Sequence, residues 1–126
     1  MSPAAAIALS GMTAATVQLT TSASNLANAN DASAVGTPGY QPLETMNSPA
    51  PGGGVTAKAV TIKQPAVLSY DPTSPLANAE GLISTPEIDP IGEIGNQIVA
   101  GRAFAFSLKA LEIADENDKV LLDLKT

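Results

Sequence analysis

The chain of 126 residues contains no cysteine, no histidine and no tryptophan. Without cysteine there is no disulfide, no thiolate nucleophile and no cysteine metal site. Without histidine the chain lacks the commonest metal ligand and the side chain that titrates near neutral pH. These absences exclude Ser-His-Asp and Cys-His catalytic arrangements.

Large side chains are also scarce. The only aromatic residues are Tyr40, Tyr70, Phe104 and Phe106, and the 44% hydrophobic fraction depends heavily on alanine. Alanine buries little apolar area, and a short chain already buries a smaller fraction of its surface. We therefore expect a marginally stable monomer whose apolar faces are completed by neighbouring chains.

Positive charge is sparse and comes late in the chain. The net charge is −6, and all six cations lie at or after Lys58, which disfavours nucleic acid and anionic membrane surfaces as partners. The N-terminal region is apolar but lacks the positive segment of a secretory signal. Its threonines and serines interrupt it too often for a membrane span of about 20 apolar residues. We expect a soluble chain without a cleavable signal.

The remaining carboxylates offer weak candidates for chemistry. Glu44 and Asp71 are conceivable as a glycosidase pair, but no aromatic platform for a sugar lies near them in the sequence. Asp115–Asp118 lacks the glycine and final glutamate of a calcium loop, and Gly52–Gly54 lacks the lysine of a phosphate loop. We expect no enzyme activity, no cofactor, no metal and no small-molecule substrate.

Residues 1–30 are predicted to form a long N-terminal helix. No charged residue occurs before Asp31, so the remainder of the helix surface is alanine, serine and threonine. Such a neutral surface suits a helix surrounded by other helices, although a surface helix of an ordinary domain is the alternative. A stripe with alternating spacings of three and four is formed by Leu9, Met12, Thr16, Leu19, Ala23, Leu26 and Asn30.

The middle of the chain is expected to hold little regular structure. Residues 31–54 are rich in glycine and proline and predict a flexible loop. Residues 55–86 predict a small β-containing insert, in which Pro65 separates two short β-prone runs that form a hairpin or edge strands. Residues 81–86 predict one more extended segment.

Residues 87–126 are predicted to form a second long helix. Asp89 is a favourable N-cap, Pro90 suits the first helical position, and Glu93 complements the helix dipole. Gly92, Gly95 and Gly101 weaken helix propensity and suggest close approach of another backbone. Arg102 is either a surface arginine with a buried stem or one partner of an interhelical or intersubunit ion pair. Apolar residues at helical spacing are Ile91, Ile94, Ile98, Ala105, Leu108 and Leu111.

The sequence thus predicts a mainly α fold with a small β insert. The two terminal helices are expected to pair as a coiled-coil-like hairpin with their ends on the same side. A single pair leaves much of the apolar stripes uncovered, so we expect self-assembly to complete the packing.

Two motifs in the N-terminal part resemble the bacterial flagellar rod and hook family, particularly its short proximal rod proteins. Ser24–Asn30, with Asn25, Leu26, Asn28 and Asn30, is similar to the family signature at the end of the first helix. Thr37–Tyr40, which includes Pro38 and Gly39, is similar to the turn that follows. Residues 31–36 intervene, as short insertions do in one proximal rod type.

The C-terminal half resembles the family over more positions. Tyr70, Asp71 and Pro72, and later Gly81, have the spacing of the family's Tyr-Asp-Pro pattern, which continues through residues 86–89. Glu93 matches a family glutamate, and Arg102-Ala103-Phe104 resembles the family's Arg-Ala-Tyr. The order and spacing extend over about 110 residues. The departures are Glu87, Gly95, residues 105–107 and the charged residues 115–119, and they indicate a divergent member.

The resemblance implies a structural subunit of the proximal rod that transmits torque from the membrane ring towards the hook and is needed for motility. It also implies export through the flagellar type III apparatus and assembly in the periplasm. The implied partners are copies of the chain, other rod proteins, membrane-ring and hook–basal-body proteins, and the export apparatus. A secreted helical-hairpin binding module or an export adaptor is the alternative. The motif residues named above, with Leu19 and Leu108 on the helix stripes, are the candidate interaction residues.

Overall fold

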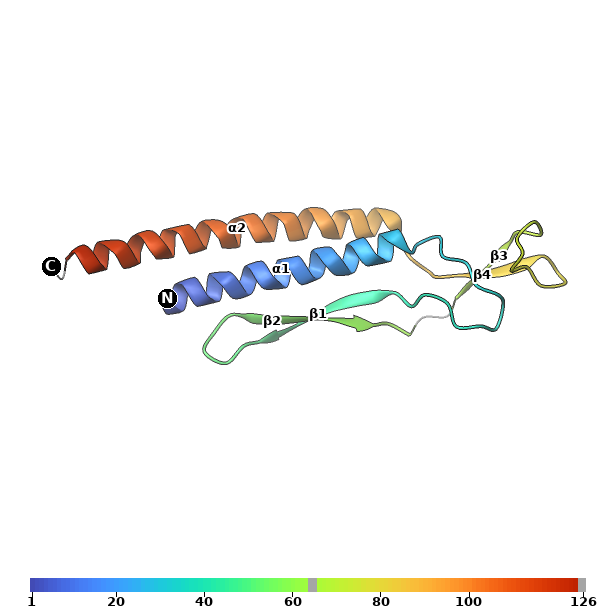
Figure 1. Cartoon of the computed structure of the whole chain (residues 1–126), viewed down its shortest axis with the longest axis horizontal. Coiled ribbons are helices and arrows are strands. Elements are labelled where there is room, and N and C mark those ends of the chain that lie inside the picture. The colour runs from blue at the N-terminus through green and yellow to red at the C-terminus, as the bar shows by residue number, and fades with distance from the viewer. Residues whose placement is uncertain (64–65, 125–126) are drawn as a thin grey trace.

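The computed structural model describes residues 1–63 and 66–124. Figure 1 shows an elongated molecule in which one terminal helix lies between the other helix and a β-hairpin, while a second hairpin projects beyond them. The expected mainly α fold with a small β insert is confirmed. The elements are α1 (Pro3–Ala27), β1 (Leu43–Pro49), β2 (Val55–Thr61), β3 (Val67–Tyr70), β4 (Leu82–Thr85) and α2 (Pro90–Asp123).

Local capping sets both ends of α1. The Ser2 side chain accepts a hydrogen bond from the Ala5 backbone N–H, and Pro3 occupies the first turn, where a missing N–H is tolerated. Asn28 ends the helix, and its side-chain amide donates to the Ser24 carbonyl at 2.8 Å. The helix therefore ends three residues before the boundary expected from the sequence.

The start of α2 agrees with its sequence signals. The Asp89 carboxylate accepts from the Ile91 N–H at 3.1 Å, and Pro90 begins the helix. The helix continues without a break through the charged residues 115–119 and extends about 51 Å. The Ser2 N–H donates to the Asp118 carboxylate at 3.3 Å. The helices are therefore antiparallel, and both termini lie at the same end (Figure 1).

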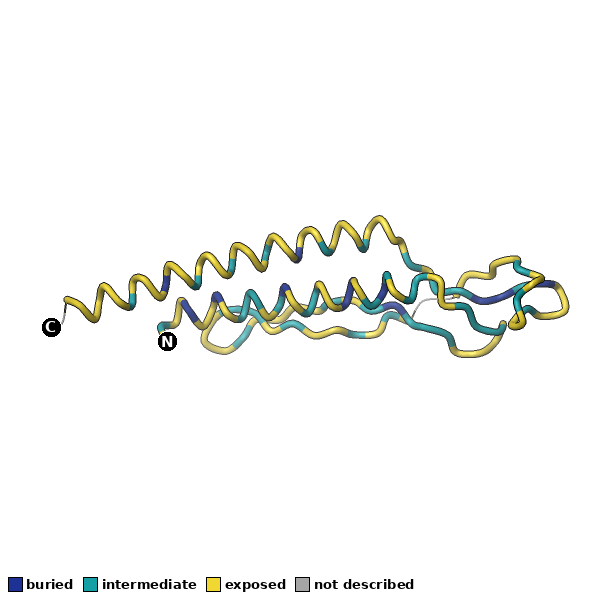
Figure 2. The backbone as a smooth tube through the Cα atoms, turned by 45° about the horizontal axis from the view of Figure 1, so that its top comes forward, coloured by how far each residue is buried: buried dark blue, intermediate teal, exposed yellow. Residues whose placement is uncertain are grey.

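Small side chains form the contact between the helices. Ala8 and Ala15 of α1 and Ala100 and Ala114 of α2 are buried, and a Cβ added at Gly11 would lie 2.6 Å from the Ser107 hydroxyl of α2. Small residues allow a short interaxial distance, which leaves no room for leucine between the backbones. Figure 2 shows the buried positions recurring along α1, with most of α2 exposed.

Most large residues of the sequence-derived stripes lie outside this contact. Leu19 is 42% exposed and Leu108 is 39% exposed. Among the described residues, no large side chain is completely buried. The expectation that one helix pair leaves much of the stripes uncovered is confirmed. The prediction that another backbone approaches Gly95 and Gly101 closely is wrong within a single chain, because a Cβ at either position would meet nothing within 4 Å.

The expectation of a flexible loop over residues 31–54 is wrong where the chain forms β1. Residues Leu43–Pro49 pair antiparallel with β2, from Leu43 opposite Thr61 to Pro49 opposite Val55. Gly52, Gly53 and Gly54 all have positive φ, which lets the chain reverse between the strands. The turn is held against α1, because the Val55 N–H donates to the Ser10 hydroxyl at 3.1 Å. Tertiary contacts thus order a segment whose sequence has only a weak preference for regular secondary structure.

The second hairpin joins strands from different parts of the insert. β3 pairs antiparallel with β4, so the two runs around Pro65 do not pair with each other, and β2 pairs back to β1 instead. Pro65 itself lies outside the described residues. The extended segment expected over residues 81–86 is confirmed as β4. Ser33 forms two backbone hydrogen bonds with Ser84, which further order the segment expected to be a loop.

A larger side chain at the helix contact should separate the helices. We expect Ala100→Leu to lower the free energy of unfolding by about 1–3 kcal/mol, because the added volume enters a site that is already filled. Ala105→Leu on the exposed side of α2 is the matched control and should change stability by less than about 0.5 kcal/mol. Denaturant unfolding followed by helical circular dichroism measures both. Equal effects would contradict the close contact.

Candidate functional site: a polar clasp and exposed apolar helix faces

A buried asparagine joins α1, α2 and β1. Asn25 is 2% exposed, and its amide nitrogen donates to the Leu43 carbonyl at 2.8 Å and to the Glu93 carboxylate at 2.6 Å. Its amide oxygen accepts from the Leu43 N–H at 2.8 Å and from the Tyr40 hydroxyl at 3.0 Å. The side chain therefore makes all four hydrogen bonds of which an amide is capable.

Two serines extend this network, which we call the polar clasp. The Ser22 hydroxyl donates to the Glu93 carbonyl at 2.7 Å, and the Ser24 hydroxyl lies 3.0 Å from the Tyr40 hydroxyl. Buried polar groups of this kind are stable only when they are paired, so the clasp fixes the relative positions of the elements that supply it. Its members are Ser22, Ser24, Asn25, Tyr40, Leu43 and Glu93.

Three of the candidate residues from the sequence meet in the clasp, namely Asn25, Tyr40 and Glu93. Ser22 and the backbone of Leu43 were missed. Ser22 precedes Asn25 by three residues and so shares its helix face, which is a signal that could have indicated it. No local signal indicates Leu43, because its role depends on the strand that it begins.

The other N-terminal motif residues shape the chain around the clasp. Asn28 caps α1, whereas Asn30 is exposed and Leu26 is partly buried. Gly39 follows Pro38 in the turn, and a Cβ at Gly39 would lie 2.8 Å from the Ser33 hydroxyl. The turn therefore requires a residue without a side chain where it passes Ser33.

The Tyr-Asp-Pro motif forms a separate turn in the β3–β4 hairpin. The Asp71 carboxylate accepts from the Thr73 N–H at 3.2 Å and from its hydroxyl at 2.7 Å, and the Asp71 N–H donates to the Gly81 carbonyl. Gly81 has φ 76°, and a Cβ there would lie 2.9 Å from the Tyr70 ring and 3.1 Å from Pro72. The motif thus specifies a tight turn.

The candidate residues on the helices lie on exposed apolar surface. Leu19 and Phe104 line a shallow groove between α1 and α2, and Leu108 lies one turn beyond Phe104. Arg102 is exposed. Other large apolar residues of α2 with more than one third of their surface exposed are Ile91, Ile94, Ile98, Val99, Phe106, Ile113, Val120, Leu121 and Leu122.

The threonines of α1 also contribute apolar surface. The Thr13, Thr16 and Thr20 hydroxyls donate to backbone carbonyls four residues earlier, at 2.9–3.0 Å. A hydroxyl that donates to a carbonyl of its own helix does not need a hydrogen-bond partner from water or from another segment. These threonines therefore present their methyl groups on the exposed surface of α1.

Residues 1–63 and 66–124 contain no group of three acidic residues that could hold a metal ion, and neither helix is long and apolar enough to cross a membrane. An exposed ion pair joins Lys109 to Glu112 at 2.7 Å, and the Glu112 hydrogen bond and charge raise the pKa of Lys109.

The fold and these surfaces define a class of protein: an antiparallel helical hairpin, joined by a buried polar clasp to a small β insert and apolar on its outer faces. No model of a known protein family matches the chain. It is, however, similar to curated flagellar basal-body rod proteins named FlgC. The protein of Escherichia coli O6:H1 is 35% identical over 114 residues, and that of Salmonella typhimurium is 32% identical over 114 residues, each with 83% of both chains covered.

A more distant bacterium has a relative of the same name. The FlgC protein of Aquifex aeolicus is 31% identical over 116 residues, with 87% of this chain and 86% of the relative covered. Identity at this level over more than four fifths of both chains shows the family. The chain belongs to the FlgC family of flagellar basal-body rod proteins.

Removal of the central amide should weaken the whole molecule. We expect Asn25→Ala to lower the free energy of unfolding by about 2–3 kcal/mol, because the Leu43 backbone and the Glu93 carboxylate lose their buried partner. Asn30→Ala is the control, since Asn30 is exposed, and should change stability by less than about 0.5 kcal/mol. Urea unfolding measures both. A loss for Asn25→Ala no larger than for Asn30→Ala would show that the clasp is not stabilising.

The Tyr-Asp-Pro turn gives a local prediction. We expect Gly81→Ala to destabilise the β3–β4 hairpin by about 1 kcal/mol or more, because it adds a Cβ at positive φ against the Tyr70 ring. Gly95→Ala, in open helical surroundings, should instead stabilise the monomer by about 1 kcal/mol. Amide hydrogen exchange of β4 and of α2 separates the two effects. Unchanged exchange in β4 after Gly81→Ala would contradict the tight turn.

Proposed function

We propose that the chain is a non-catalytic structural subunit of the proximal part of the flagellar basal-body rod and transmits torque from the membrane ring towards the hook. The carrying observation is the exposed apolar surface on both helices, together with membership of the FlgC family. The two helices meet through small side chains, so their large apolar residues stay exposed and need further chains to cover them. A binding module or export adaptor would also need exposed faces, but alignment over most of both chains favours the rod.

The proposal includes the partners and the route of the protein. The apolar faces contact copies of the chain and other rod proteins, while membrane-ring and hook–basal-body proteins lie at the ends of the assembly. The subunit passes through the flagellar export apparatus and assembles in the periplasm. A cysteine-free chain with a core of small residues suits this route, because it has no covalent crosslink and little buried area to disrupt before threading.

The test places a charge on the exposed apolar surface. We expect Leu19→Asp or Leu108→Asp to abolish incorporation into basal bodies and motility, because a carboxylate would be buried without a partner in the assembly. Immunoblots of purified basal bodies and swimming assays measure this in a strain that lacks the chromosomal copy.

Conservative variants serve as controls. Leu19→Met and Leu108→Met keep the volume and should preserve motility. Both leucines are substantially exposed in the single chain, so circular dichroism should show that the aspartate variants keep their helices. Normal swimming with either aspartate variant would contradict the proposed packing.

A further inference from the structure

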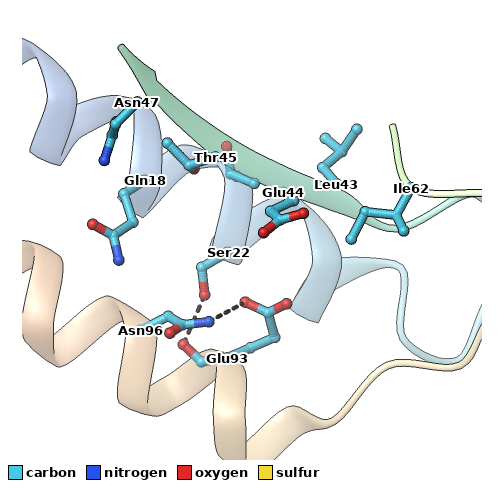
Figure 3. Close-up of a pocket in the computed structure, with 10 residues that line it drawn as sticks. Gln18, Ser22, Leu43, Glu44, Thr45, Asn47, Ile62, Glu93 and Asn96 are labelled. Carbon is cyan, nitrogen blue, oxygen red and sulfur yellow. Dashed lines mark hydrogen bonds between the residues drawn. The ribbon is translucent and has the colours of Figure 1, made fainter. Parts of the chain in front are cut away.

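A polar pocket lies beside the clasp, between α1, β1 and the first turns of α2. Figure 3 shows the carboxylates of Glu44 and Glu93 directed into the space between β1 and α2. The pocket has a volume of about 370 Å³, which is room for several waters or a planar side-chain group. It is lined by Gln18, Thr21, Ser22, Leu43, Glu44, Thr45, Asn47, Ile62, Glu93 and Asn96.

The pocket holds hydrogen-bonding capacity that the described chain leaves unused. Thr21 is only 5% exposed, yet its hydroxyl has no hydrogen-bond partner, and the buried hydroxyl of Thr45 has none either. Buried polar atoms are normally paired, so two unpaired hydroxyls in one pocket favour a polar partner from outside the described chain. The two carboxylates beside them favour a cation with several N–H donors.

Several other described carboxylates are bonded locally within the chain. Glu112 is paired with Lys109, Asp71 and Asp89 bond to turn and cap N–H groups, and Asp118 accepts from Ser2. Glu44 is exposed and makes none of these local bonds, whereas the Glu93 carboxylate accepts from the Asn25 amide at 2.6 Å and from the Asn96 amide at 3.4 Å. No cation of the described chain lies within ion-pair distance of either carboxylate. Two carboxylates therefore line one pocket without a positively charged partner from the described chain.

Arg102 is the complementary group. It is exposed and lies two residues after the buried Ala100, which places it on the opposite side of α2 from α1. It makes no ion pair within the described chain, so the interhelical pair considered from the sequence is absent. Gly95 lies seven residues before Arg102 and so on the same side of the helix, and its open space leaves room for another surface to approach there.

We propose that Arg102 of one copy enters the polar pocket of a second copy and pairs there with Glu44 and Glu93. This inference rests on the proposed function as an assembling subunit. The planar guanidinium supplies five donors, which suits two carboxylates and two hydroxyls better than the ammonium of lysine does. Donor and acceptor lie on different parts of the molecule, so each copy can use both, and the contact builds a ring or a helical array.

A charge exchange tests the pair in assembled basal bodies. Arg102→Glu and Glu44→Arg, each expressed as the sole copy, should each reduce the amount incorporated by about tenfold or more, since loss of one partner leaves the other charge buried and unpaired. The double variant Arg102→Glu with Glu44→Arg should recover most of the incorporation. Glu93 is left unchanged because it also belongs to the clasp.

Matched charge changes elsewhere are the controls. Lys119→Glu and Glu116→Arg alter exposed residues of α2 by the same charge and should incorporate like the unmodified chain. Circular dichroism of each purified variant checks that the helices are retained. Incorporation of Arg102→Glu at the unmodified level, or a double variant as defective as the single ones, would overturn the pairing.

The outcomes also separate this inference from the rod proposal. If the unmodified chain is found in basal bodies and Leu19→Asp is excluded while Arg102→Glu enters normally, the rod function stands and the ion pair is wrong. If Glu44→Arg is excluded but Arg102→Glu is not, the cation belongs to another rod protein and our assignment of Arg102 is overturned. If the unmodified chain is absent from basal bodies, the rod proposal itself fails.

Discussion

The buried amide of Asn25 is the constraint on which the rest of the structure depends. It holds the first residue of β1 by both backbone groups and the first turn of α2 by the Glu93 carboxylate. The helix contact beside it consists of alanine, glycine and serine, which contribute little apolar area. In a molecule without a completely buried large side chain among the described residues, a saturated polar centre supplies the specificity that a core of leucine and phenylalanine usually supplies.

Local signals in the sequence predicted both helices and the N-cap of α2. Asp89 and Pro90 begin α2, and the asparagine-rich segment ends α1, because capping depends on residues adjacent to the helix. They did not predict β1, since Leu43–Pro49 is ordered by pairing with β2, by the Asn25 amide and by a turn that rests on Ser10. These contacts come from distant parts of the chain, and no periodicity within the strand reports them.

Only part of the candidate site was predictable from the sequence, and its arrangement was not. Asn25, Tyr40 and Glu93 were indicated by motif, and the structure brings them together over separations of up to 68 residues. The pocket beside them was not predicted, because the unpaired hydroxyls of Thr21 and Thr45 become meaningful only once both are buried. The sequence likewise did not reveal which face of each helix forms the inner contact, since small residues and large residues recur at the same helical spacing.

The distance in sequence between paired groups has a consequence for how the molecule forms. Ser2 pairs with Asp118, 116 residues later, and the helical partner of α1 is the last element of the chain. Contacts of such high sequence separation form late, after the entropy of closing a long loop has been lost. The N-terminal helix therefore has no helical partner until almost the whole polypeptide is present. The contact between the two helices cannot form before this last element is present, whereas the contact of α1 with the β1–β2 hairpin involves only the first half of the chain.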